Sequence, residues 1–282
     1  MPLLAALLLL LAPGSDYLQE IAAWRAEREA RLQTDTGWLT VVGLHWLEQG
    51  ANTVGSSAKA AVVLPRPAPE TVGTITLRGT RAEFVAAAGV KVTSKGKPVR
   101  RIVTDEDVPL EVGPLTFYVI ERGSRVGVRV RDRNAETRRN FHGLRWYDAD
   151  PRWRVSAKLE APRPDRKITI ANIVGDQMDV ESAGELVFTL NGRELRLEAL
   201  YETPAHDELF VMFKDRTNGD ATYGAGRYMY PPLPVNGIVE LDFNKAYNPP
   251  CAYTAFATCP LPPRQNWLPV PIEAGEKSYE AH

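Results

Sequence analysis

The sequence contains few cysteines and histidines, and it has almost no net charge. Its 282 residues include 2 Cys and 4 His, and 34 Lys and Arg face 35 Asp and Glu, which leaves a formal net charge of −1. A zinc site needs several closely spaced Cys or His ligands, and nucleic-acid-binding domains usually carry a clear basic excess. We therefore expect no metal, no cofactor and no nucleic-acid partner.

Common catalytic motifs are also missing. There is no G-x-S-x-G elbow, no G-x-x-x-x-G-K-[ST] loop and no H-E-x-x-H pair. Gly224-Ala225-Gly226 lacks the third glycine and the strand-to-helix context of a dinucleotide-binding turn. The motifs therefore leave open whether the protein is an enzyme.

No apolar run is long enough to cross a membrane. The longest, Leu3–Ala12, has ten residues, whereas a membrane-spanning helix needs about 20. Its length is typical of a signal peptide, and Ala12-Pro13-Gly14 offers small residues for cleavage, although no Lys or Arg precedes the run. We expect residues 1–14 to be a signal peptide and the protein to be exported, periplasmic or extracellular, without a stable membrane span. The alternative is an N-terminal anchor or an unprocessed apolar tail.

Residues 15–36 predict the main helix of the chain. Asp16 is suited to cap it, and Glu27 and Arg31 form a favourable i,i+4 pair. After residue 40 short β-rich runs alternate with turns, as the 21 Gly and 22 Pro suggest. We expect an all-β fold, a sandwich or a barrel with one N-terminal helix, divided into β subdomains at 37–121 and 122–282.

Turn residues predict details within the second subdomain. Asn191-Gly192 favours a tight two-residue hairpin, and Asn218-Gly219, between two other expected strands, suggests a second hairpin. Proline is dense between Pro231 and Pro271. Because proline donates no hydrogen bond to a sheet, this tail is expected to wrap over the surface or line a cleft rather than form a central strand.

Four segments of the C-terminal third, together with the first residues after the signal, resemble a known family. The tail segments are 222–228, 241–253 (LDFNKAYNPPCAY), 258–263 (TCPLPP) and 271–277 (PIEAGEK), and the matching start segments are 17–25, 37–39 and 43–47. Together they resemble a bacterial and archaeal domain-of-unknown-function family. The resemblance implies no established activity.

A second resemblance covers residues 50–55 and 63–65. Their residue pattern is similar to the start of a forkhead-associated β-sandwich. Such domains read phosphothreonine with an Arg after the glycine. Here Ser56 follows Gly55. The resemblance therefore implies an N-terminal sandwich without phosphopeptide binding.

Cys251 and Cys259 are the two cysteines of the chain. In an exported protein an even pair at short spacing favours a disulfide, and we expect one between them. Free structural thiols, or a thiol nucleophile or metal ligand with His142 or His206 as partner, are the alternatives.

A polar cluster marks the tail as a candidate binding site. Strand alternation places Asp242 and Asn244 on one face, with Asn248 following, and Arg227 and Tyr223 precede them on a neighbouring strand. We expect Arg227 and Asp242 to approach each other if these two strands pair around the Pro231–Pro234 turn. The cluster is either a polar pocket closed by the Pro-rich loop or a buried network that ties the loop to the sheet.

The favoured function is therefore an exported ligand-binding or accessory module that takes a small molecule or glycan. The alternative is a hydrolase of anionic or carbohydrate substrates that uses Asp242 with Asp215 as acid and base.

The middle of the chain is rich in arginine. Arg129 and Arg131 alternate with Val128 and Val130 and are expected on one face of a strand. A solvated sheet face is the default interpretation, and a surface for an anionic ligand or acidic glycan is the alternative.

Overall fold

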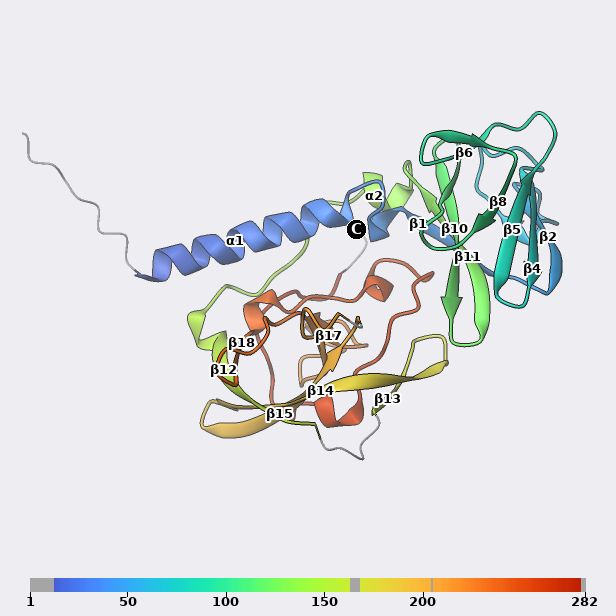
Figure 1. Ribbon diagram of the computed structural model, residues 1–282. Helices are drawn as coiled ribbons and strands as arrows, with labels where there is room; N and C mark the ends of the chain where they lie inside the picture. Colours follow the sequence, from blue (N-terminus) through green and yellow to red (C-terminus); the bar gives the residue numbers. More distant parts are fainter. Residues whose placement is uncertain (1–12, 163–167, 204, 280–282) are drawn as a thin grey trace, which may run out of the picture.

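The computed structural model describes residues 13–162, 168–203 and 205–279, so most of the predicted signal peptide at 1–14 lies outside the described residues. Figure 1 shows one long helix, α1 (Pro13–Leu32), and two groups of β-strands. A second helix, α2 (Glu136–Arg139), is a single turn. The predicted all-β fold with one N-terminal helix is confirmed. In the described ranges no helix is both long and apolar enough to cross a membrane.

Helix α1 is shifted slightly relative to its prediction at 15–36. It begins at Pro13, which suits the first turn of a helix because the missing N–H would have no partner there. Asp16 therefore lies inside the first turn rather than before it. In the first turn its negative charge still complements the helix dipole. The chain reverses over the last turn, and a Cβ on Gly37 would lie 2.1 Å from the carbonyl oxygen of Leu32. Glycine at 37 permits this close approach.

The first group of strands is a sandwich of two sheets. One sheet has the order β1-β11-β10-β9-β6-β7 and the other β3-β2-β4-β5-β8. The strands are β1 (Val41–Trp46), β2 (Gly50–Gly55), β3 (Val62–Val63), β4 (Gly73–Arg78), β5 (Arg81–Ala86), β6 (Val92–Ser94), β7 (Lys97–Val99), β8 (Arg101–Thr104), β9 (Leu110–Val112), β10 (Leu115–Arg122) and β11 (Arg125–Asp132). Both sheets share one core, in which Phe84 packs edge-on against Phe117 with ring centroids 5.6 Å apart.

The sandwich extends past the boundary predicted at 121/122. That boundary falls at the end of β10, whereas β11 pairs with β10 from Leu115↔Asp132 to Arg122↔Arg125 and so belongs to the first unit. In the structure the side chains of β11 alternate, so that Val128 and Val130 enter the sandwich core while Arg129 faces the other way.

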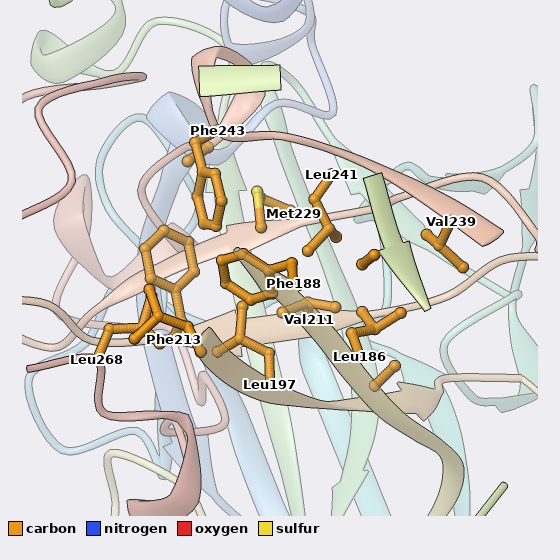
Figure 2. Packing of buried hydrophobic residues seen from close by; sticks show 14 of the residues in the cluster. Leu186, Phe188, Leu197, Val211, Phe213, Met229, Val239, Leu241, Phe243 and Leu268 are labelled. Atoms are coloured by element: carbon orange, nitrogen blue, oxygen red, sulfur yellow. The ribbon is translucent and has the colours of Figure 1, made fainter. Parts of the chain in front are cut away.

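The second group of strands forms the C-terminal domain. Its main sheet has the order β13-β14-β12-β18, with β15 pairing with β14, and β16 pairs with β17 separately. The strands are β12 (Arg154–Glu160), β13 (Ile168–Ala171), β14 (Gln177–Leu190), β15 (Arg193–Tyr201), β16 (Val211–Phe213), β17 (Arg227–Met229) and β18 (Ile238–Asp242). Figure 2 shows how Phe188, Phe213 and Phe243 pack together in its core. The ring centroid of Phe243 lies 5.7 Å from that of Phe188 and 5.5 Å from that of Phe213.

Both predicted hairpins form, and the first has the two-residue turn that its sequence favours. Asn191 and Gly192 have φ of 51° and 75° and join β14 to β15, with Leu190 opposite Arg193, which fits a type I′ turn. Asn218-Gly219 lies in the connection 214–226 between β16 and β17, which pair antiparallel, so the second predicted hairpin forms around a long loop rather than a two-residue turn. In this loop the side-chain amide of Asn218 donates hydrogen bonds to the Thr222 hydroxyl and to the carbonyl of Tyr223.

The Pro-rich tail behaves as predicted, since its one strand, β18, lies at the edge of the main sheet. The expected pairing of the strands around Pro231–Pro234 does not form. β17 pairs with β16, and β18 pairs with β12, because each finds an unpaired edge elsewhere in the domain. Figure 1 shows the tail winding between α1 and the C-terminal sheet.

Candidate functional site

Arg227 and Asp215 form a buried ion pair. Arg227 Nη2 lies 2.7 Å from Asp215 Oδ2, and neither side chain is exposed. Arg227 also donates to the carbonyls of Ile272 and Ala274, and Asp215 Oδ1 accepts from the amides of Thr217 and Ile272. The pair therefore ties the end of the tail to β17. Its acidic member is Asp215, not Asp242 as the sequence suggested.

Asp242 and Asn244 are brought together, but around Tyr17 of α1. The Tyr17 hydroxyl donates to Asp242 at 2.9 Å and accepts from Asn244 Nδ2 at 2.8 Å. Asn244 Nδ2 also donates to the carbonyl of Asp150, and Asp242 caps the backbone N–H of Asn244. Burial and the adjacent Asp242 raise the pKa of the Tyr17 hydroxyl, so it keeps its proton. This network anchors α1 on the C-terminal domain.

Asn248 and Tyr223 join neither of these pairs. Fully buried Asn248 donates to both oxygens of Glu276, at 2.8 Å from its side chain and 3.0 Å from its backbone. The Tyr223 hydroxyl donates to the carbonyl of Cys251 at 3.0 Å. The predicted site residues thus fall into four separate sets of contacts, each directed at its own members and at backbone. Of them, Asp242 also borders a small hollow of about 70 Å³.

The disulfide predicted between Cys251 and Cys259 is not formed, and both thiols are free. Cys251 lies in a short 3₁₀ turn (Pro250–Ala252). Its backbone N–H donates a hydrogen bond to Cys259 Sγ, with 3.1 Å between the nitrogen and the sulfur. A disulfide needs the two Cβ atoms to face each other. Here the two side chains remain thiols that are hydrogen-bonded to each other, and Cys259 Sγ also accepts from the Cys251 amide.

A larger cavity lies where the sandwich, α1 and the C-terminal domain meet. Its volume is about 520 Å³. Arg28 of α1, Trp38, and Arg122 and Arg129 of the sandwich line it on one side. The tail motif contributes Tyr247, Pro250, Thr258, Cys259 and Pro260. The segments that carry the family resemblance therefore build part of the cavity wall, and Cys259 is the one candidate residue of the tail among the described lining residues.

An aromatic cluster forms the C-terminal wall of this cavity. Phe210 packs edge-on against Tyr228 and stacks on Tyr230, with centroids 5.0 and 4.9 Å apart. Tyr230 in turn stacks on Tyr247 at 6.4 Å. Burial raises the pKa of all three tyrosine hydroxyls, so the wall stays uncharged. Such a wall suits the flat apolar part of a ligand.

The cavity also holds three arginines in different electrostatic settings. Arg28 stacks over Tyr247 at 4.3 Å and lies 3.9 Å from Glu276. Arg122 lies 3.5 Å from Glu106. Arg129 is 2% exposed, stacks over Trp38 at 4.9 Å and forms no ion pair with any described residue.

Two carboxylates share the lining, Glu121 and Glu202. Glu202 accepts a hydrogen bond from the hydroxyl of Tyr230. The described lining thus carries more positive than negative charge.

Sequence reasoning missed most of this cavity because its residues come from distant segments. The alternation of Val128, Arg129 and Val130 was the available signal, since it puts an arginine on the outer face of the strand. The structure corrects the default interpretation of that face, because Arg129 is buried rather than solvated.

Several solved structures are similar to parts of this chain. An uncharacterized protein from Haloarcula marismortui, solved by solution NMR, is 34% identical over 52% of this chain and 82% of its own length, with a TM-score of 0.42. The FhaA FHA domain, solved in complex with the intracellular domain of Rv3910, is 16% identical over 31% of this chain and 97% of its own, with a TM-score of 0.23. A domain from a study of phosphothreonine-dependent FHA interactions is 17% identical over 33% and 96%, also with a TM-score of 0.23.

The sequence pattern of one family matches residues 139–277, which include all four tail segments noted above. No curated protein matches the chain. The chain belongs to the family described as "Protein of unknown function (DUF1684)".

Proposed function

We propose that this protein is an exported ligand-binding or accessory module, and that its ligand is a small organic molecule held in the cavity between the sandwich, α1 and the C-terminal domain. The observation that carries the proposal is the cavity itself, about 520 Å³ with a largely aromatic wall. Small-molecule sites typically enclose about 300–1,000 Å³, are mostly apolar and lie where domains meet.

The position of the cavity supports a preformed site. Arg125 of β11 and Asp176 of the C-terminal domain pair at 2.7 Å, and Asp176 accepts a hydrogen bond from Asn172 of the cavity lining. Arg122 of β10 donates to Thr258 of the tail at 3.1 Å. Contacts of this kind hold the two walls together without a ligand, so little ordering is needed on binding.

The hydrolase alternative finds less support. It needs Asp242 and Asp215 to face one substrate as acid and base. Asp215 is paired with Arg227, and Asp242 is held by Tyr17 and Asn244. The two carboxylates serve different networks, so the binding proposal is preferred.

A fluorescence titration with N-phenylnaphthylamine, a neutral flat probe, tests the proposal. The probe should bind the wild-type protein and gain fluorescence. Val180→Trp, in the cavity lining on β14, should weaken binding about tenfold or more, because overfilling a packed site costs more than 1 kcal/mol.

Val103→Trp on β8 is the matched control. Val103 is 38% exposed and belongs to the far sheet of the sandwich, so this variant should bind the probe like wild type. Equal binding by Val180→Trp, with unchanged thermal unfolding, would place the probe elsewhere and contradict the proposal.

A further inference from the structure

Arg129 is a buried cation without a counter-charge in the described structure. The alternation of β11 turns Val128 and Val130 into the sandwich core and Arg129 outward, where the C-terminal domain covers it to 2% exposure. Its one hydrogen bond to the described residues runs from Nη2 to Thr258 Oγ1 at a long 3.3 Å, and Nε has no partner. A guanidinium stays charged at any physiological pH, and a buried charge is stable only when it is paired.

The surroundings of Arg129 show where an anion would fit. Arg122 Nε also donates to Thr258 Oγ1, at 3.1 Å, so two guanidinium groups converge on one hydroxyl in the cavity wall. The carboxylates in the lining do not neutralise Arg129, because neither Glu121 nor Glu202 forms an ion pair with it. The aromatic wall at Phe210 and Tyr228 faces the same cavity.

We propose that the ligand of this cavity is an organic anion with a flat apolar body. Its carboxylate or sulfonate head lies beside Thr258 and accepts hydrogen bonds from Arg129 and Arg122, while its body packs on the aromatic cluster. The inference rests on the proposed function and specifies its ligand class. Charge-assisted hydrogen bonds to arginine supply the selectivity for a negative head.

Two matched probes test the charge requirement. Anilinonaphthalene sulfonate and N-phenylnaphthylamine share their ring system and differ by the sulfonate. The wild-type protein should bind the anion about tenfold more tightly or better, since one hydrogen bond to a charged group is worth at least that factor. Arg129→Gln should reduce this preference to about one.

Arg131→Gln is the matched control. Arg131 is two residues along the same strand but lines a different hollow, with Tyr118 and Glu106, so this variant should keep the wild-type preference. Arg122→Gln, at a partly exposed position, is a second variant for the case in which Arg129→Gln does not fold, and it should also lower the preference.

The outcomes separate the two proposals. If the wild-type protein binds both probes equally and Val180→Trp still weakens binding of the neutral probe, the anion inference is overturned. The proposed binding function is then still supported. An anion preference that survives in Arg129→Gln also overturns it. Failure of both probes to bind the cavity overturns the proposed function and the inference with it.

Discussion

At the residue scale, the best-defined polar feature is the Arg227–Asp215 pair. It excludes solvent and is completed by backbone groups of residue 272, whose carbonyl accepts from Arg227 and whose amide donates to Asp215. A buried pair contributes little net stability when intact, but removing one member leaves the other charge without compensation. The pair therefore has a structural role, since it connects β17 to the backbone of residues 272 and 274.

Arg227→Ala and Asp215→Ala should each lower the free energy of unfolding by about 3–5 kcal/mol. The double variant should lose clearly less than the sum, because the two residues share one interaction. Urea denaturation of all three variants measures this coupling. Arg227→Ala combined with Asp242→Ala should be additive, and a strong coupling there would restore the pairing that the sequence suggested.

The two thiols differ in chemistry although they are neighbours. A hydrogen bond from the Cys259 thiol, which outweighs the effect of burial, lowers the pKa of Cys251. The same bond, followed by burial, raises the pKa of Cys259. The pKa of Cys251 is lower in the folded protein than in the unfolded chain. The Cys251 thiolate therefore stabilises the folded protein above the unfolded pKa, and this contribution is lost as pH falls through the folded pKa.

Iodoacetamide should therefore modify Cys251 before Cys259 in the native protein, as followed by mass spectrometry. Cys259→Ala should slow the modification of Cys251 at neutral pH, because it removes the hydrogen bond that favours the thiolate. Denatured, unreduced protein should show both thiols free. A protein without free thiols would contradict this prediction and favour the disulfide.

At the scale of elements, α1 is held to the C-terminal domain by polar contacts. Tyr17 reaches Asp242, and Lys245 of the tail pairs with Glu20 at 2.5 Å. Near its other end Arg28 Nη2 donates to the carbonyl of Asn248 at 3.0 Å. Since Arg28 also lines the cavity, the position of α1 determines part of the proposed ligand site.

Tyr17→Phe should lower the free energy of unfolding by about 1–3 kcal/mol, because it removes the buried hydroxyl that donates to Asp242 and accepts from Asn244. Thermal or urea unfolding measures the loss. Leu18→Ala is the control on the same helix. Leu18 is 45% exposed, so its truncation should change little. Equal stability of wild type and Tyr17→Phe would mean that α1 is not anchored here.

At the scale of the whole molecule, export stays a proposal that depends on residues 1–14. N-terminal sequencing of protein secreted by cells that express the full chain should begin near Ser15, because the apolar run ends at Ala12 and small residues follow. The helix would then keep Asp16 in its first turn. A mature soluble protein that retains Met1 would contradict export.

Local patterns were sufficient to determine much of this protein from its sequence. Turn chemistry placed the Asn191-Gly192 hairpin, proline density kept the tail out of the sheet centre, and short alternating runs indicated an all-β fold. The tail motif identified the family. Each of these depends on residues close together in the chain, where backbone preferences and side-chain periodicity act directly.

Only the tertiary structure decided which surfaces meet. Alternation places Arg129 and Arg131 on one face of β11. It does not predict that the C-terminal domain covers Arg129. Arg227 pairs with Asp215 rather than Asp242 because β17 joins β16 and β18 joins β12. The cavity is assembled from segments more than 200 residues apart, Arg28 and Pro260 among them. Contacts over such distances depend on how sheets and helix pack, and no local preference encodes that choice.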